Sequence, residues 1–349
     1  QMSATLLGTT KPLVEEFELA LLDLDGVCYS GADPVVHAAD SVMAAKGQGL
    51  RTCFVTNNAS RTPAQVVAKL AGFGIEADEQ QIYTAAMDAV ALLAEHVPAP
   101  ATVLVVGGAG VEQALTEAGY TTTRSALDNP VAVVQGYDPS VDWAAMSEAA
   151  YAITNGALHV ATNLDSTLPT ERGFALGNGS LVAAVVHATE RQPLAAGKPF
   201  AGIYTRAIAR SGGGKAIAVG DRLNTDHAGA RQSSLPSLHV LTGVASARDV
   251  LLAPPQYRPT FLHTDLRGLL EPAPAPQRVD DGWLVGDAVA KVENGAVTLS
   301  FDGKNVELGG QSVTLSLNAY RAAAVAAWDL ADQGQTLSNL PDITVAEAR

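Results

Sequence analysis

Two aspartates, Asp23 and Asp25, stand one residue apart at the end of an apolar run, and Gly26 follows them. Acids at positions i and i+2 of an extended strand face the same side, and a glycine turn allows the second acid to rotate across the site. Such a pair can divide group transfer between its members, one carboxylate attacking while the other transfers a proton. Two aspartates that form a turn and cap a helix give the same short pattern, so the pair alone leaves both interpretations open.

Two further polar segments also lie at a strand end or a helix start. Thr56, Asn57 and Asn58 end the second apolar run and offer a hydroxyl, side-chain amides and backbone N–H groups that suit phosphate oxygens. Lys198 stands at a predicted helix start, where its ammonium and the helix dipole together attract an anion. The alternatives for these segments are an ordinary polar turn and a solvated surface lysine.

A fourth polar segment, residues 219–226, follows another apolar run and contains Asp221 and Asp226. Its alternative interpretation is a polar loop. In open α/β sheets, ligands bind at the carboxyl ends of the strands. Because all four segments lie at strand ends or helix starts, we expect them to converge around one ligand.

The four segments together resemble the four ordered motifs of the haloacid dehalogenase superfamily of phosphatases. The matching segments are residues 23–29, 54–58, 197–199 and 219–226. They are similar to the branch that contains nucleotide, phosphoglycolate and pyridoxal-phosphate phosphatases, in which a large cap lies between the second and third motifs. The proline-rich linker and the appended domain described below are similar to those of actinobacterial glycerol-3-phosphate phosphatases.

The resemblance implies a role for each motif residue. Asp23 would attack phosphorus and form an aspartyl-phosphate, while Asp25 protonates the leaving alkoxide and then activates water. Mg²⁺ would be held by Asp23, by the backbone carbonyl of Asp25 and by Asp221, with Asp226 supporting this shell. The phosphate oxygens would be held by Thr56, Asn57, Asn58 and Lys198.

The implied cap contains a segment similar to the T-N-x-D sequence of related caps. Its polar residues Asn163 and Asp165, with Arg172 downstream, are the candidates for contacting the leaving group. Asp and Asn at a turn more often bond their own backbone, so the turn interpretation is preferred for each residue taken alone.

Strand-length apolar runs alternate with helical patterns along most of the chain, as in residues 17–24, 50–56, 102–106 and 216–219. This alternation predicts an α/β fold with a doubly wound, Rossmann-like parallel sheet. Together with the resemblance, it predicts an inserted α/β cap and a small C-terminal α+β appendage. The expected limits are a core of residues 1–83 and 192–270, a cap of 84–191, a proline-rich linker of 271–278 and an accessory domain of 279–349.

Local signals define several elements more closely. A capping box with proline at the first helical position predicts a helix over residues 62–72, and helical periodicity predicts another from 199 to the glycines at 212–214. In the accessory domain, Asn-Gly at 294–295 predicts a hairpin, and residues 318–331 read as an Ala-rich helix.

Composition limits the partners of this 349-residue chain. It carries 22 Lys and Arg against 36 Asp and Glu, a net charge of −14, which disfavours a nucleic-acid partner. No run approaches 18 apolar residues, so we expect no membrane insertion. A small phosphorylated metabolite is the expected partner, and homo-oligomer formation stays open.

Cysteine and histidine add less to the functional prediction. Cys28 and Cys53 cannot form a disulfide framework for a chain of this size, which favours the reducing cytoplasm, and packing is the preferred role for both. His227 follows Asp226, where the family usually has an apolar residue. We expect this histidine to face solvent at a helix start, and contact with the metal shell is the alternative interpretation.

The predicted function is Mg²⁺-dependent hydrolysis of glycerol 3-phosphate to glycerol and phosphate. Phosphoglycolate, pyridoxal phosphate and a nucleotide are the alternative substrates. A catalytically silent scaffold on the same fold is the alternative of a different class. Such a scaffold would normally lack an acid or the lysine, and here Asp23, Asp25, Lys198 and Asp221 are all present, which favours catalysis.

Overall fold

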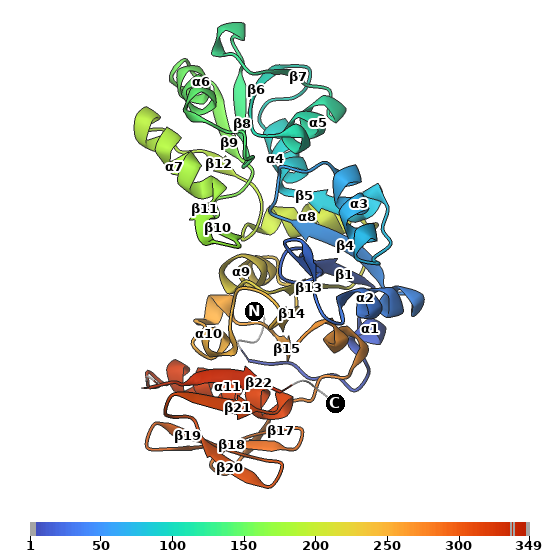
Figure 1. Cartoon of the computed structure of the whole chain (residues 1–349), viewed down its shortest axis with the longest axis vertical. Coiled ribbons are helices and arrows are strands. Elements are labelled where there is room, and N and C mark those ends of the chain that lie inside the picture. The colour runs from blue at the N-terminus through green and yellow to red at the C-terminus, as the bar shows by residue number, and fades with distance from the viewer. Residues whose placement is uncertain (1–4, 336, 338, 347–349) are drawn as a thin grey trace. The chain divides into compact units, whose positions relative to one another are not determined.

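The computed structural model describes residues 5–335, 337 and 339–346, and Figure 1 labels their helices and strands. The chain forms two compact units. The first unit comprises Gln1–Thr52 and Gly212–Arg349, and the second, Cys53–Ser211, is inserted between these two segments. The chain crosses into the second unit within β4 (Arg51–Thr56) and returns just after α8 (Ala201–Arg210).

The first unit contains a parallel sheet whose strands run in the order β15, β14, β13, β1. These strands are β1 (Leu19–Leu22), β13 (Ala216–Gly220), β14 (Ser237–Val240) and β15 (Phe261–His263). Every residue of the four strands is buried, as expected for a parallel sheet covered on both faces. Because Leu22 pairs with Val219, the polar residues that follow β1 and β13 emerge side by side.

Short helices and turns surround this sheet. They are α1 (Leu13–Glu16), α2 (Ala38–Gly47), the π-helical turn η3 (Leu223–His227), α9 (Ala228–Gln232), α10 (Ala247–Leu251) and the 3₁₀ turns η4 (Pro255–Tyr257) and η5 (Leu266–Leu270). A small hairpin, β2 (Tyr29–Ser30) with β3 (Asp33–Pro34), follows the first motif.

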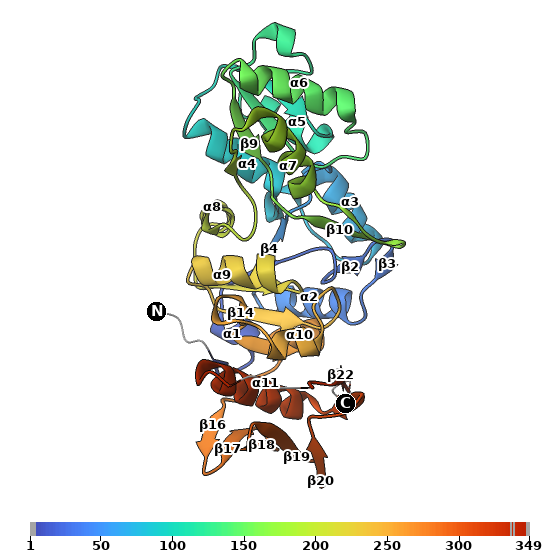
Figure 2. The ribbon, with the colours of Figure 1, turned by 90° about the vertical axis from the view of Figure 1, so that its left-hand side faces the viewer.

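The C-terminal part of the first unit is an antiparallel five-stranded sheet with one long helix on its face (Figure 2). The strands are β16 (Gln277–Val279), β17 (Gly282–Val285), β18 (Ala288–Glu293), β19 (Ala296–Phe301) and β20 (Lys304–Glu307). The helix is α11 (Leu317–Asp332), and β21 (Ser312–Leu315) pairs in parallel with β22 (Asp342–Val345). Asn294 and Gly295 both have positive φ and join β18 to β19, which confirms the predicted hairpin.

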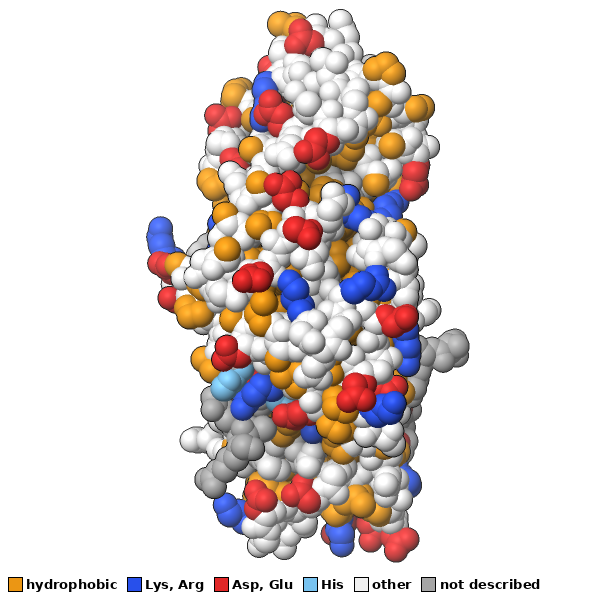
Figure 3. Space-filling model, turned by 90° about the vertical axis from the view of Figure 1, so that its right-hand side faces the viewer, with side chains coloured by type: hydrophobic (Ala, Val, Ile, Leu, Met, Phe, Trp, Pro, Cys, Tyr) orange, Lys and Arg blue, Asp and Glu red, His pale blue; other side chains and the backbone are white. Residues whose placement is uncertain are grey.

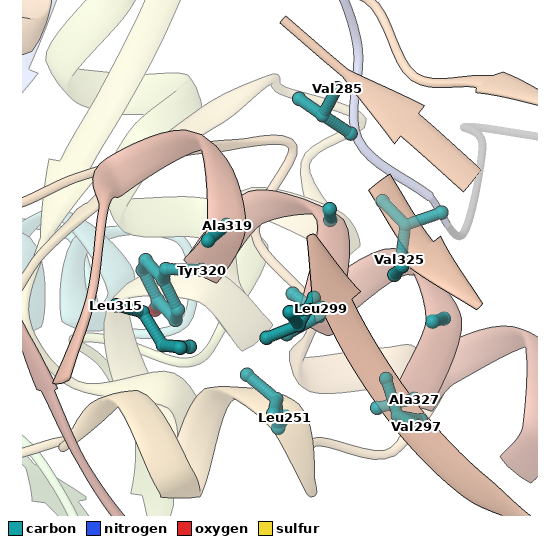
Figure 4. Packing of buried hydrophobic residues seen from close by; sticks show 14 of the residues in the cluster. Leu251, Val285, Val297, Leu299, Leu315, Ala319, Tyr320, Val325 and Ala327 are labelled. Carbon is teal, nitrogen blue, oxygen red and sulfur yellow. The ribbon is translucent and has the colours of Figure 1, made fainter. Parts of the chain in front are cut away.

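Helix α11 shares a hydrophobic core with the parallel-sheet part of the unit. This core combines residues of β17–β19 and α11 with Val250 and Leu251 of α10 and Leu262 of β15 (Figure 4). Arg258 donates to both carboxylate oxygens of Asp332 at 2.8 Å. The appendage is therefore packed into the first unit as part of one core.

The predicted linker is paired along part of its length with the N-terminal segment. The amide of Thr9 donates to the carbonyl of Ala273 at 2.8 Å, and the amide of Leu13 donates to that of Glu271 at 3.3 Å. Strand β16 then begins at Gln277, inside the predicted linker.

The second unit is built on a parallel sheet in the order β12, β9, β8, β6, β7. Its strands are β6 (Thr102–Val106), β7 (Thr121–Thr123), β8 (Ala132–Gln135), β9 (Leu158–Ala161) and β12 (Leu194–Ala195). Val103 and Val105 pack toward α4 (Ala85–Ala94) and α5 (Ala109–Glu117). Leu104 and Val106 pack toward α6 (Trp143–Thr154) and α7 (Asn178–Thr189), so helices cover both faces.

The remaining elements of the second unit include β5 (Ile82–Thr84), which pairs in parallel with β4, and the hairpin of β10 (Thr167–Thr170) and β11 (Gly173–Leu176). Two 3₁₀ turns are η1 (Glu79–Gln81) and η2 (Ala126–Asp128). Helix α3 (Pro63–Gly72) confirms the predicted capping box, since Thr62 and Gln65 exchange side-chain hydrogen bonds with each other's amides.

The α/β fold class is confirmed in both units. The compact second unit contains the end of β4, α3, β5 and α8 in addition to the predicted cap of residues 84–191. The limits of core, cap, linker and accessory domain stay a prediction.

Among the described residues, no helix combines the length and apolarity needed to cross a bilayer. On the face shown in Figure 3, acidic and basic side chains are interspersed rather than gathered by sign.

Candidate active site

Three carboxylates meet at the carboxyl ends of β1 and β13 in the first unit. Asp23, Asp221 and Asp226 each offer an oxygen atom, and these atoms lie within 4.8 Å of one another. Asp23 and Asp221 follow paired strands. The π-helical turn η3 then brings Asp226 back, with its Oδ2 accepting the amide of Arg222 at 3.0 Å. The sequence analysis assigned Asp226 to a supporting role outside the metal ligands. In the structure, a carboxylate oxygen of Asp226 lies within the cluster itself.

Asp221 is the most deeply buried of the three acids, with no exposed surface. Its Oδ2 accepts the amide of Val244 at 2.7 Å, while its Oδ1 is buried and has no hydrogen-bond partner among the described residues. Burial, followed by the charge of Asp226, raises the pKa of Asp221 to about 6. A buried anion with an unsatisfied oxygen and like-charged neighbours is stabilised by a bound cation.

Three glycines surround this cluster at positions where any larger side chain would clash with its carboxylates. A Cβ at Gly26, which has a φ of +84°, would lie 2.5 Å from Oδ2 of Asp221, and one at Gly243 would lie 1.9 Å from the same atom. A Cβ at Gly220 would lie 2.3 Å from the side chain of Asp226. The donor set consists of oxygens only, which suits Mg²⁺. The residues present therefore fit the expected metal.

Asp25 lies outside the carboxylate cluster, with its side chain exposed. The turn predicted at Gly26 is present, because the amide of Gly26 donates to the carbonyl of Tyr29 at 2.8 Å. Thr242 fixes this turn by donating its hydroxyl to the carbonyl of Gly26 at 2.6 Å. An exposed carboxylate beside an acidic cluster is available to exchange protons with substrate and water.

The second and third motifs meet in the second unit. Lys198 is 2% exposed, and its Nζ donates to the carbonyl of Val55 at 2.8 Å. Asn57 joins the two motifs, because its Oδ1 accepts the amide of Lys198 at 2.8 Å and its Nδ2 donates to the carbonyl of Lys198 at 3.0 Å. Asn58 follows in a turn in which its own amide donates to Oγ1 of Thr56 at 3.1 Å.

Two of the three cap candidates contact Asn57. Nδ2 of Asn57 lies 3.2 Å from both carboxylate oxygens of Asp165, and Nδ2 of Asn163 donates to the carbonyl of Asn57 at 2.7 Å. The amide of Asp165 also donates to Oδ1 of Asn163 at 3.1 Å, a local contact of the kind that the turn interpretation describes. The side-chain amide of Asn57 is thus engaged by protein groups. Arg172 lies elsewhere, exposed in the turn between β10 and β11.

Sequence reasoning missed Asp88, a fully buried acid on α4. Its Oδ2 accepts the amide of Gly197 at 2.9 Å, directly before Lys198, and its Oδ1 accepts from Arg206 at 3.0 Å and from the hydroxyl of Tyr83 at 3.1 Å. The available signal was a single acid within an otherwise apolar helix, because a buried carboxylate needs partners.

The expectation that His227 faces solvent is wrong, because its side chain is fully buried. Its Nδ1 lies 2.8 Å from Oγ of Ser237, and its Nε2 lies 3.1 Å from the carbonyl of Gly220. The π-helical turn directs the ring toward β13 and β14 rather than outward. His239 on β14 is a second buried histidine, and its ring packs against that of His227. The sequence analysis did not identify His239.

Both cysteines are free and buried. Burial, reinforced by Asp23 and Asp25, raises the pKa of Cys28 far above its usual range. Burial raises the pKa of Cys53 to about 11, although a hydrogen bond from Ser211 opposes this shift. Neither thiol therefore forms a thiolate nucleophile at neutral pH, which supports the packing interpretation.

Comparisons with known proteins agree with this geometry. A family model described as haloacid dehalogenase-like hydrolase matches residues 20–121, and a second, described as HAD-hydrolase-like, matches residues 195–269. The chain is 41% identical over 323 residues to the D-glycerol 3-phosphate phosphatase of Mycobacterium tuberculosis (strain ATCC 25618 / H37Rv), covering 91% of this chain and 88% of that one. It is 38% identical to the 5′-nucleotidase YutF of Bacillus subtilis (strain 168), covering 64% and 87%.

Among solved structures, the chain is similar to a glycerol phosphate phosphatase from Mycobacterium tuberculosis in complex with magnesium. The TM-score is 0.81 at 39% identity, and the match covers 97% of each chain. The same protein in complex with calcium gives a TM-score of 0.79, also at 39% identity.

Proposed function

Because this chain belongs to the haloacid dehalogenase-like hydrolase family, we propose that it is a Mg²⁺-dependent phosphatase that hydrolyses glycerol 3-phosphate to glycerol and phosphate. The observation that carries the proposal is the carboxylate cluster of Asp23, Asp221 and Asp226, with the unpartnered buried Oδ1 of Asp221. Asp23, Asp221 and Asp226 are the residues that would hold Mg²⁺, and the backbone carbonyl of Asp25 is a further candidate. Bound Mg²⁺ supplies positive charge that offsets the negative charge of the phosphate during transfer.

In the proposed mechanism, an oxygen of Asp23 attacks phosphorus, and the bond between phosphorus and the glycerol oxygen breaks. Asp25 gives its proton to the departing oxygen, so glycerol leaves neutral. Asp25 then takes a proton from water, whose oxygen attacks phosphorus and breaks the bond to Asp23. The resemblance to the family assigns Thr56, Asn57, Asn58 and Lys198 to the phosphate oxygens.

The choice of substrate is supported by the extent of the likeness. The match to the mycobacterial glycerol phosphate phosphatase covers 97% of each chain and so includes the C-terminal sheet and α11, whereas the match to the nucleotidase covers 64% of this chain. A comparison of kcat/KM for glycerol 3-phosphate, phosphoglycolate, pyridoxal phosphate and AMP tests this choice. We expect glycerol 3-phosphate to give the highest value, and poor turnover of it beside a strong rival would overturn the choice of substrate.

Chelation separates the enzyme from a catalytically silent scaffold. We expect EDTA to stop phosphate release and added Mg²⁺ to restore it, since the acidic cluster cannot receive an anionic substrate without a cation. Activity that persists after removal of divalent metal would contradict the proposed role of Mg²⁺. No turnover of any phosphomonoester by the Mg²⁺-loaded protein would favour the scaffold.

The proposed compartment is the reducing cytoplasm, which suits two free buried thiols. The proposed partner is a small phosphorylated metabolite.

A further inference from the structure

Two buried imidazoles hold the backbone at the end of β13, next to the carboxylate cluster. Nε2 of His239 lies 3.0 Å from the carbonyl oxygen of Asp221, and Nε2 of His227 lies 3.1 Å from the carbonyl oxygen of Gly220. Both histidine side chains are fully buried, and their rings pack with centroids 5.2 Å apart.

The hydrogen bonds define the tautomer of each ring. A carbonyl oxygen only accepts, so Nε2 carries the proton in both histidines. Nδ1 of His227 then accepts the hydroxyl of Ser237 at 2.8 Å. Nδ1 of His239 has no hydrogen-bond partner among the described residues, which fits a neutral ring that acts only as a donor.

These contacts bear on the geometry of the metal-binding acids. The carbonyl of Asp221 also accepts the amide of Ala245 at 3.2 Å, and its Oδ2 accepts the amide of Val244. The backbone and one carboxylate oxygen of Asp221 are thereby fixed, which leaves Oδ1 available to a ligand. Because His227 directly follows Asp226, its bond to Gly220 ties the turn that carries Asp226 to the end of β13.

We propose that His227 and His239 are positioning residues for the divalent cation, holding Asp221 and Asp226 at the separation that one ion requires. The inference rests on the proposed function and extends it to residues that touch neither substrate nor metal. Hydrogen bonds of this outer kind typically change metal affinity about 10- to 100-fold when they are removed.

The test is a direct measurement of Mg²⁺ affinity by isothermal titration calorimetry on the full-length protein without substrate. His239→Leu removes the donor to Asp221, whereas His239→Gln keeps an N–H at a similar distance along the side chain. We expect His239→Leu to weaken Mg²⁺ binding about 10- to 100-fold and His239→Gln to recover most of that loss. His159→Leu is the matched control, because His159 is also buried but lies in the second unit.

A second, milder variant guards against misfolding of His239→Leu. Ser237→Ala keeps both rings but removes the hydroxyl that donates to Nδ1 of His227, and we expect a smaller loss of Mg²⁺ affinity. Circular dichroism and thermal unfolding establish that each variant is folded. Wild-type Mg²⁺ affinity in folded Ser237→Ala and His239→Leu would overturn the inference while leaving the proposed function standing. Absence of Mg²⁺ binding in the wild-type protein would instead sink the proposed function and the inference with it.

Discussion

At the scale of single residues, Asp23 combines two properties, a nucleophilic oxygen and a negative charge close to two other acids. Asp23→Asn keeps the shape of the side chain but removes both. We expect phosphate release to fall below detection, because an amide cannot form the aspartyl-phosphate. In EDTA we expect the variant to unfold at or above the wild-type temperature, since one of three neighbouring like charges is gone.

Phosphate release and thermal unfolding are measured on the same preparation, so that loss of activity is separated from loss of the fold. Near-normal turnover by Asp23→Asn would refute the assignment of the nucleophile.

His159 makes the stability of the second unit depend on pH. Burial lowers its pKa from the ordinary 6.5 to about 4, so the folded chain keeps the ring neutral where the unfolded chain protonates it. Between these two pH values the unfolded state therefore binds more protons than the folded state. The contribution of His159 to the free energy of unfolding is fully present above pH 6.5 and is lost as the pH falls toward 4. The full effect corresponds to about 3 kcal/mol.

Urea unfolding at pH 7 and pH 4.5 measures this dependence. We expect His159→Gln to show a smaller loss of stability between the two pH values than wild type. His187→Gln is the control, because His187 is exposed on α7 and its removal should leave the loss unchanged. Equal pH dependence in wild type and His159→Gln would contradict the prediction.

How far single residues could be predicted depends on whether their role is visible in local spacing. Asp23 and Asp221 lie in short motifs at strand ends, and the structure places them together. The buried positions of Asp88 and His227 depend on partners far along the chain, such as Gly197, and on the π-helical turn. The single acid in an otherwise apolar helix signals that Asp88 needs partners but does not identify them, and the π-helical turn has no local signal. Sequence reasoning therefore missed the first residue and misplaced the second.

At the scale of elements, the first turn of α5 packs directly against the loop that follows the second motif. The amide of Gly110 donates to the carbonyl of Ser60 at 3.2 Å. A Cβ at Gly110 would lie 2.4 Å from the carbonyl oxygen of Ala59 and 2.6 Å from that of Arg61. A side chain at this position has no room unless the backbone shifts.

We therefore expect Gly110→Ala to lower the free energy of unfolding by about 1–3 kcal/mol, measured by urea denaturation. Gly72→Ala is the matched control, since Gly72 also lies in a helix of this unit but a Cβ there would meet nothing within 4 Å. The control should be neutral or slightly stabilising. Equal stabilities of the two variants would contradict the close packing.

Elements with strong local signals were predicted well. Helix α3 starts at its capping box, and the hairpin turn falls at Asn294 and Gly295. The pairing of the predicted linker with Thr9 was missed, because that hydrogen bond joins segments more than 250 residues apart and depends on tertiary structure.

At the scale of the whole molecule, the C-terminal sheet and α11 share one hydrophobic core with α10 and β15. Trp328 is 1% exposed, and its Nε1 donates to the carbonyl of Val250 at 2.8 Å. Trp328→Ala removes a large buried side chain and this hydrogen bond, so we expect a loss of about 3–5 kcal/mol.

Because the core is shared, the loss should appear in the unfolding of the whole first unit. Calorimetry, together with hydrogen exchange at amides of β13 and α11, checks this. Weakened protection in α11 with unchanged protection in β13 would show that the appendage unfolds independently.

The insertion of one unit within another also sets the order in which the chain can fold. β1 pairs with β13, so the central strands of the first unit close a loop that contains the entire second unit. The side chains of Cys53 and Ser211 hydrogen-bond to each other, which places the two ends of the inserted unit together once it has folded. Early folding of the insert therefore shortens the effective loop and reduces the entropy lost when β1 meets β13. During synthesis, Asp23 emerges before the insert, and Asp221 and Asp226 emerge after it, so the carboxylate cluster cannot assemble until the whole insert has been synthesised.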